Sequence, residues 1–192
     1  MRTFILYSKT ASTSPFIKDL KKAGRIDILL HSIISALFTS NYFRGDVELH
    51  LILMGPPNPP KHINIKYEDG NSISKKDLKK LIEMSLRKAK DNKRIKVHPG
   101  VYVDNLSIEE VLDELKGEIF LLDNYGKFIR EYEKEKLKDG IFILGDHEGF
   151  DKKTKKFLKK NTNRLSLGKR VYFTSQAITI INYELDLLEL EE

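Results

Sequence analysis

Short apolar runs rich in β-branched residues alternate along this chain with longer stretches of helical periodicity. The short runs cover residues 3–7, 46–54, 118–122 and 141–144. Alternation of this kind is typical of an α/β fold, in which crossover helices join parallel strands. The last two runs are almost wholly apolar, so we expect them to be core parallel strands. The chain is therefore predicted to form a mostly parallel sheet flanked by helices.

Several of the intervening segments are predicted to be helices. The first begins near Ile26 and carries apolar residues on most of its sides, so it should be buried over most of its circumference. Capping boxes at residues 74–77 and 107–110 each precede an amphipathic helix, and Gly117 is placed to end the second. Residues 171–188 are rich in β-branched residues but also fit a helical face, and their length favours a helix.

A proline-rich turn interrupts the pattern after the second run. Gly55 is followed by four prolines in five positions, which forbids both a helix and a central strand and predicts a rigid extended turn. Residues 62–67 then alternate apolar and polar side chains, which predicts a half-exposed strand.

Length, charge and cysteine content narrow the class of protein. The 192 residues fit one domain, 1–192, with a sizeable core. The absence of cysteine excludes disulfides, Cys-ligated metal centres and a thiol nucleophile. We find no apolar stretch of 18 residues and no signal-peptide pattern, so we expect a soluble cytoplasmic protein without membrane contact. The net charge of +6 indicates either a polyanionic partner or a solvated basic surface.

The basic residues are concentrated in one segment. Residues 152–170 hold nine bases and no acid, whereas residues 184–192 hold five acids and no base. In the probable helix of the basic segment, Lys152, Lys155, Lys156, Lys159 and Lys160 project from one side, which suits nucleic-acid phosphates or a solubilising face. A second basic cluster at residues 75–94 is interrupted by acids and is typical of an ordinary solvated helix.

Three glycine-containing turns follow predicted strands, at residues 123–126, 144–149 and 165–168. Ligands of open α/β sheets bind beyond the carboxyl ends of strands, so these turns are candidates for one pocket, although each alone also fits a plain turn. No dinucleotide or P-loop motif is present, and the five histidines show no metal-ligand spacing, so we expect no metal. We expect His31 and His50 to be packed, and His147 to lie in the second turn.

The segment Gly24-Arg-Ile-Asp27 places a guanidinium and a carboxylate at the start of an otherwise apolar helix. Because the helix dipole alone favours an acidic residue there, Asp27 has a structural interpretation beside a functional one.

Taken together, these motifs resemble those of the archaeal tRNA pseudouridine-54 N1-methyltransferases of the SPOUT superfamily. The resemblance rests on the 24–27 segment, Leu53-Met-Gly-Pro-Pro-Asn-Pro-Pro60, Phe142-Ile-Leu-Gly-Asp-His-Glu-Gly149, Ser166-Leu-Gly168, Ser175-Gln-Ala-Ile178 and Asn182-Tyr-Glu-Leu185. It implies a trefoil knot within residues 118–190, S-adenosylmethionine as methyl donor, tRNA as substrate and a homodimer.

The resemblance also implies site residues. By position it places Leu122, Gly145, Leu165, Ser166, Leu167, Gly168 and Ala177 around the methyl donor. Ala177 stands where the family usually has cysteine, so no thiol acts there.

Methylation at nitrogen needs no cysteine nucleophile, because N1 of pseudouridine attacks the sulfonium methyl once its proton is lost. We hypothesise that Asp27 accepts this proton and that Arg25 pairs with a phosphate or with the ring anion, with Asp146 and His147 as reserve candidates. Tyr42, Phe43 and Tyr125 are available to stack an extruded base.

Two other functions remain open at this point. One is a related knotted enzyme that methylates pseudouridine in ribosomal RNA. The other is an RNA-binding or ribosome-assembly protein that keeps the fold without turnover. Tight donor binding separates both enzymes from the latter, and the choice of RNA separates the two enzymes.

Overall fold

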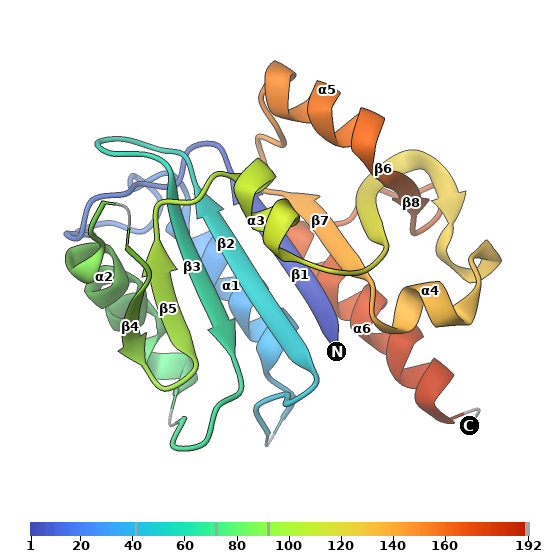
Figure 1. Cartoon of the computed structure of the whole chain (residues 1–192), viewed down its shortest axis with the longest axis horizontal. Coiled ribbons are helices and arrows are strands. Elements are labelled where there is room, and N and C mark those ends of the chain that lie inside the picture. Colours follow the sequence, from blue (N-terminus) through green and yellow to red (C-terminus); the bar gives the residue numbers. More distant parts are fainter. Residues whose placement is uncertain (41, 72, 92, 191–192) are drawn as a thin grey trace.

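An eight-stranded sheet forms the centre of the protein (Figure 1). The structure is a computed structural model, and it describes residues 1–190 except 41, 72 and 92. The end of the acidic run, residues 191–192, lies outside the described residues. The strand order is β4-β5-β3-β2-β1-β7-β6-β8. The strands are β1 (Arg2–Ser8), β2 (Val47–Leu53), β3 (Lys61–Lys66), β4 (Ile95–His98), β5 (Val101–Asp104), β6 (Ile119–Phe128), β7 (Ile141–Gly145) and β8 (Asn163–Ser166).

One half of the sheet is parallel and the other is antiparallel. Strands β2, β1, β7, β6 and β8 run parallel, as predicted, whereas β3, β5 and β4 pair antiparallel at the other end. We predicted no strand at β4 or β5. Each is only four residues long, and a turn at Pro99-Gly100, where Gly100 has φ +76°, joins them. Such short, partly polar strands are held by pairing with their neighbours, β5 with β3 and β4 with β5, rather than by an apolar run of their own.

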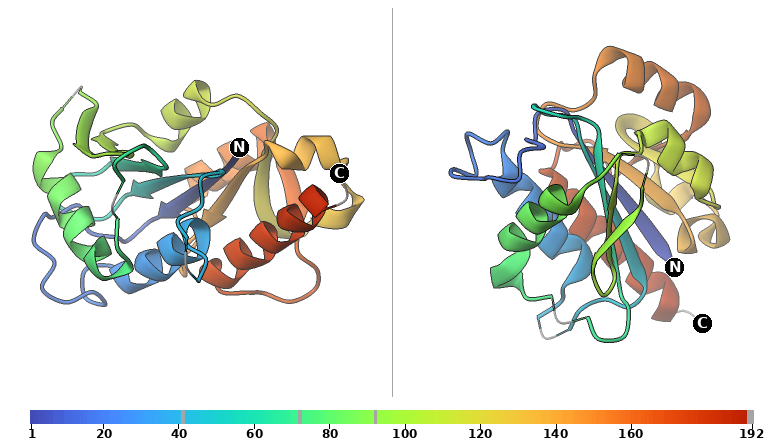
Figure 2. Two further views of the ribbon diagram at one scale, coloured as in Figure 1. Left: turned by 90° about the horizontal axis from the view of Figure 1, so that it is seen from below. Right: turned by 60° about the vertical axis from the view of Figure 1, so that its left-hand side comes forward.

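Helices cover both faces of the sheet (Figure 2). On one face α1 (Ile26–Leu37) and α6 (Thr174–Leu190) lie side by side, and α2 (Leu78–Lys88) follows them toward the antiparallel end. On the other face α3 (Ile108–Glu114) and α5 (Lys152–Asn161) pack on a second, smaller apolar cluster. The short α4 (Lys134–Lys138) lies beside α6. Within the described part of the chain, no helix is long and apolar enough to span a membrane.

The predicted helices are present, but the cap at Ser74 and the burial of His31 differ from the prediction. The Ser107 capping box is confirmed, since its side chain accepts from Glu110 N and the Glu110 side chain accepts from Ser107 N. Ser74 instead caps a single 3-10 turn, Lys75–Asp77, that leads into α2. In α1 six of twelve residues are buried, and His31 is exposed on the side away from the sheet, contrary to our expectation. The helical prediction for residues 171–188 is confirmed from Thr174 onward.

Strand β3 is buried on both faces, so its prediction as a half-exposed strand was wrong. Its polar residues face a hydrogen-bonded network instead of water. The His62 ring joins His50 Nδ1 and Asp104 Oδ1, each over 2.8 Å, and Arg94 Nε donates to Asp104 Oδ2 over 2.8 Å. His50 is buried, which confirms the prediction that it is packed. Its ring and the other polar side chains of this face form hydrogen bonds with side chains of neighbouring strands instead of with water.

Candidate active site

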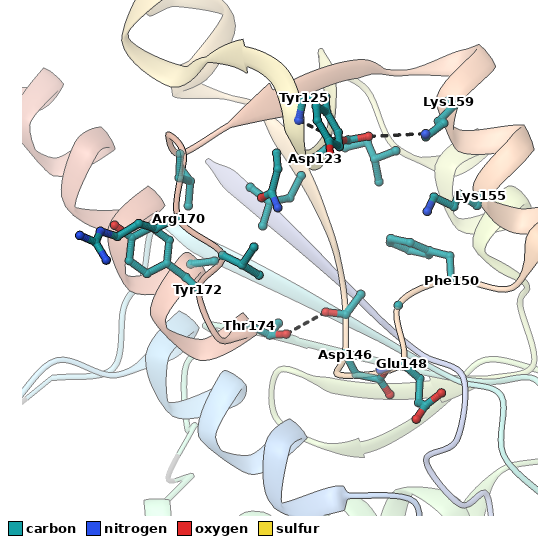
Figure 3. A pocket seen from close by; sticks show the side chains of 18 residues that line it. Asp123, Tyr125, Asp146, Glu148, Phe150, Lys155, Lys159, Arg170, Tyr172 and Thr174 are labelled. Carbon is teal, nitrogen blue, oxygen red and sulfur yellow. Dashed lines mark hydrogen bonds and ion pairs between the residues drawn. The ribbon is translucent and has the colours of Figure 1, made fainter.

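A cavity of about 430 Å³ lies where the parallel strands β6, β7 and β8 end (Figure 3). Three segments line it. Residues 121–125 lie within β6, where its pairing with β8 shifts register between Leu122 and Lys127, so the turn predicted at 123–126 is an irregular part of this strand. The other two segments are the loops at residues 145–150 and 167–174, and α5 and α6 complete the wall. The prediction that the three glycine turns form one pocket is thus confirmed. The volume lies in the range of small-molecule sites, and the position is the one that open α/β sheets use for ligands.

Gly145 allows the 145–150 loop to fold back closely on the end of β7. A Cβ atom at this position would lie 2.8 Å from Gly149 Cα and 3.3 Å from a ring carbon of Phe150. The carbonyl oxygen of Gly145 accepts a hydrogen bond of 2.8 Å from Thr174 Oγ1, which ties the start of α6 to the end of β7. A side chain here would therefore push Gly149 and Phe150 away from the end of β7 and change the shape of the cavity wall.

Four of the predicted donor-binding residues line the cavity: Leu122, Gly145, Leu167 and Ala177. The other three lie behind this lining and shape the loop after β8. Leu165 is buried in the core, and the Ser166 hydroxyl accepts from Gly168 N over 3.0 Å. Gly168 has φ +110°, a conformation that favours glycine.

Charged side chains of both signs surround the apolar part of the cavity. On one side, Asp123 accepts from Arg164 Nε and from Tyr125 N, each over 3.0 Å. Burial alone would raise the pKa of Asp123, but these hydrogen bonds outweigh it and lower the pKa below its usual value. Lys155 and Lys159 contribute positive charge on the α5 side of the cavity, and Arg170 contributes positive charge on the opposite side (Figure 3).

Two lining residues, Asp123 and Glu148, lie within turns that the sequence analysis proposed for the pocket. The lining residues that our sequence reasoning missed lie just outside the turns, and among them are Phe150, Arg170, Tyr172 and Thr174. Their one common signal is position, since each lies within a few residues of a glycine turn at a strand end. Of the three aromatic residues considered for stacking, only Tyr125 lines the cavity, and its side chain is 88% exposed. Phe43 packs against Phe38 and Tyr67 instead.

The first strand anchors the loop between β7 and α5 at both ends. The Ser8 hydroxyl donates to the buried carboxylate of Asp146, and the Tyr7 hydroxyl donates to Asp151 Oδ2 over 2.6 Å. Asp146 Oδ1 in turn accepts from Glu148 N over 2.9 Å. Asp146 lines the cavity, so this reserve candidate also has a structural role in holding the loop.

Arg25 and Asp27 form an ion pair at the start of α1 that lies outside the lining of the cavity. Arg25 Nε donates to Asp27 Oδ1 and Arg25 Nη2 to Asp27 Oδ2, each over 2.9 Å. The hydrogen bonds from Arg25 lower the pKa of Asp27, although burial acts in the opposite direction. The structure of the single chain therefore does not bring this predicted catalytic pair into the predicted donor site.

The ion pair is nevertheless held in a defined backbone. Arg25 has φ +62°, and Gly24 packs so closely that its Cβ would lie 1.7 Å from the carbonyl oxygen of Thr10. Ala11 N donates over 3.1 Å to the same Ser8 hydroxyl that contacts Asp146. A continuous set of contacts thus links the turn at Gly24 to the wall of the cavity.

Among the described residues, one group of carboxylates has metal-like spacing: Asp46, Asp186 and Glu189. All three pair with the Arg2 guanidinium at 2.6 to 3.0 Å, and Arg44 adds further pairing to Asp186. Because two arginines already pair with these three carboxylates, the cluster is a structural ion-pair network that fastens α6 to β1.

The class of protein follows from comparison with known folds and sequences. The Archaeoglobus fulgidus protein Nep1, solved with S-adenosylhomocysteine, shares this fold with a TM-score of 0.68 at 14% identity, over 98% of each chain. A family model described as "Putative SAM-dependent RNA methyltransferase" matches residues 1–190.

Full-length relatives narrow this further. The tRNA (pseudouridine(54)-N(1))-methyltransferase of Pyrococcus abyssi is 35% identical, over 98% of both chains. The Methanosarcina acetivorans protein of the same name is 34% identical, over 100% of this chain and 93% of its own. The chain therefore belongs to this family of S-adenosylmethionine-dependent RNA methyltransferases.

Proposed function

We propose that this protein transfers a methyl group from S-adenosylmethionine to N1 of pseudouridine 54 in tRNA. The observation that carries the proposal is the cavity at the ends of β6, β7 and β8, in a chain that matches enzymes of that name over nearly its full length. As such an enzyme it would act in the cytoplasm, on tRNA, and without a metal.

The cavity suits the methyl donor in shape and charge. Leu122, Leu167 and Ala177 offer apolar walls for the adenine ring, and Gly145 lets the ring approach the backbone. Asp123 and Glu148 carry negative charge for the ammonium and sulfonium groups, and Arg170 carries positive charge for the donor's carboxylate. When bound, the donor supplies an electrophilic methyl group on sulfur.

Asp27 is our proposed proton acceptor for N1, and Arg25 its regulator. While Arg25 holds the Asp27 carboxylate, the pKa of Asp27 stays low and the carboxylate is a weak base. An RNA phosphate that draws Arg25 away would return the pKa of Asp27 toward its ordinary value. Binding of the RNA would thereby make the Asp27 carboxylate a stronger general base for the methylation step.

A homodimer would bring this pair to a donor cavity. In one chain, Arg25 and Asp27 lie outside the cavity, so we propose that they act at the site of the partner subunit. The support is the exposed apolar surface beside the cavity: Val171 and Phe173, before α6, are 79% and 78% exposed, and Tyr183 on α6 is also exposed. Apolar surface of this kind marks an interface.

We also propose that residues 1–192 form one domain whose residues 118–190 are tied into a trefoil knot. The support is the path of the last third of the chain. Segment 167–174 lies against both the 121–125 and the 145–150 segments before the chain crosses to α6, on the face that holds α1.

Tyr125 is our proposed platform for the extruded base. It lies on the wall of the cavity with its ring almost wholly exposed. Stacking on such a ring holds a base without reading its identity, so selectivity for pseudouridine would rest on its N1–H.

The decisive experiment incubates the purified chain with methyl-labelled donor and tRNA transcripts, with and without prior pseudouridylation at position 54. We expect label only in the pseudouridylated tRNA. A pseudouridylated ribosomal RNA fragment tests the rRNA alternative. Transfer to unmodified uridine, or to the ribosomal fragment alone, would refute the substrate assignment, and donor binding without transfer to any RNA would favour a non-catalytic role.

A further inference from the structure

Helix α5 carries a group of lysines that the methyl donor does not need. Lys152, Lys155, Lys156, Lys159 and Lys160 recur at helical spacing and together line a shallow hollow on one side of α5. We call these five residues the lysine face. Since a helix rises 1.5 Å per residue, the face extends over roughly 12 Å, with its ammonium groups in adjacent rows.

The charge of the lysine face is largely unbalanced. All five side chains are exposed, and of the five only Lys159 makes an ion pair with a described residue, at 3.8 Å from Asp123. The lysines around α2 differ, because Lys79 and Lys80 pair with acids of their own helix turn. Desolvation of exposed lysines costs little when an anion replaces water, so the lysine face is ready to bind a polyanion.

The lysine face adjoins the cavity directly. Lys155 and Lys159 belong both to the lysine face and to the cavity wall, and α5 stands at the edge of the sheet where β7 ends (Figures 1 and 3). Tyr125 lies next to Asp123, which pairs with Lys159. A nucleic-acid strand bound to the lysine face would therefore pass close to Tyr125, the proposed stacking platform.

The apolar side of α5 argues for a nucleic acid rather than a lipid surface. Leu158 is fully buried and Phe157 packs against the smaller core cluster, so the exposed side presents lysines and Asn161 but no apolar side chain. A helix that binds a membrane interface needs an exposed apolar stripe, and the outward side of α5 has none.

From these observations we propose that the lysine face is the docking surface for the phosphate backbone of the substrate RNA, which it guides into the donor cavity. The inference rests on the RNA substrate of the proposed function and adds the surface that recognises it. The ligand chemistry is a run of phosphodiesters, and the contacts carry no sequence information.

The test is the salt dependence of RNA binding, measured without methyl donor. The variant Lys152→Gln/Lys156→Gln/Lys160→Gln spares the two lysines of the cavity wall. If all three contact phosphates, the slope of log K against log salt should fall in magnitude by about 2 to 3, and affinity for a tRNA transcript at ~0.15 M salt should weaken roughly 50-fold or more. Donor affinity, measured by calorimetry, should change less than about twofold, because these residues lie outside the cavity lining.

A matched control removes the same charge elsewhere. Lys76→Gln/Lys80→Gln/Lys90→Gln changes three exposed lysines around α2, which packs on β3, β4 and β5 at the other end of the sheet. Screening limits long-range effects to a Debye length of roughly 8 Å, so this variant should keep nearly the wild-type slope.

Several outcomes would overturn the inference. They are an unchanged slope in the α5 variant, an equal loss in both variants, binding of the wild type to anionic vesicles but not to tRNA, or no RNA binding by the wild type at all. Failure of the proposed function is distinguishable: a wild type that binds tRNA through the lysine face but transfers no methyl group refutes the reaction and leaves the docking surface intact.

Discussion

Gly145→Ala tests the donor cavity at the point where the 145–150 loop folds back on the end of β7. The new Cβ would lie 2.8 Å from Gly149 Cα and 3.2 Å from Gly149 C, distances that require the backbone of the 146–150 loop to move by several tenths of an ångström. Overpacking of this kind costs about 1 to 3 kcal/mol. Because the loop is anchored to β1 through Asp146 and Asp151, we expect the displacement to fall on the cavity side.

The expected result is weaker binding of S-adenosylmethionine, by roughly 5- to 150-fold if the whole cost appears in the binding free energy. Isothermal titration calorimetry measures this directly, and urea unfolding of the same variant shows how much of the cost appears in stability instead. Gly45→Ala is the matched control, because its Cβ meets nothing within 4 Å and its backbone has no positive φ. If the Gly145 variant binds donor within twofold of wild type and is equally stable, the reasoning about this close approach is wrong.

Three further predictions concern the proposed general base Asp27, the proposed stacking residue Tyr125 and the stability of the fold in acid. Asp27→Asn should lower kcat roughly 100-fold or more with unchanged donor affinity, because a positioned general base typically contributes that much; single-turnover methylation measures it, and full activity removes Asp27 from the mechanism. Tyr125→Phe should keep kcat/KM for tRNA, whereas Tyr125→Leu should lower it roughly 5- to 150-fold, since one stacked base contributes about 1 to 3 kcal/mol; equal effects of both variants would exclude stacking. The free energy of unfolding should fall as the pH falls below 6.5, because burial lowers the pKa of His50 and the unfolded chain takes up that proton first. It should fall further between about pH 4 and 2: burial would raise the pKa of Asp104, but hydrogen bonds from His62 and Arg94 lower it to about 2, which corresponds to roughly 2 kcal/mol. Urea titrations should show this lower step, and its persistence in Asp104→Asn would contradict the assignment.

Four of the five strands in the parallel half, β1, β2, β6 and β7, could be predicted because each contains a continuous apolar run. Such runs carry their own signal within a few residues, as at residues 141–144. The antiparallel half could not be predicted in this way. The burial of His62 depends on His50 and Asp104, which come from two other strands, and a local pattern does not show partners so distant along the chain.

The same distinction holds for the candidate site. The pocket formed by the three glycine turns could be predicted from their position at strand ends, where ligands bind in this class of fold. The assignment of Leu122, Gly145 and Leu167 to the donor, the expected knot and the proposed roles of Arg25 and Asp27 came from the resemblance to a family. Periodicity does not report how loops thread, and the separation of this pair from the cavity depends on the packing of α1.

The central place of β1 has a consequence for biosynthesis. This strand leaves the ribosome before the other seven strands of the sheet, yet it lies between β2 and β7, and Thr3 pairs with Ile141. During translation one edge of β1 therefore stays unpaired until most of the chain has been made, and contacts so distant in sequence form slowly. An exposed strand edge invites association with other nascent chains. A chain released before residue 163 would hold seven of the eight strands but none of the last loop that closes the cavity.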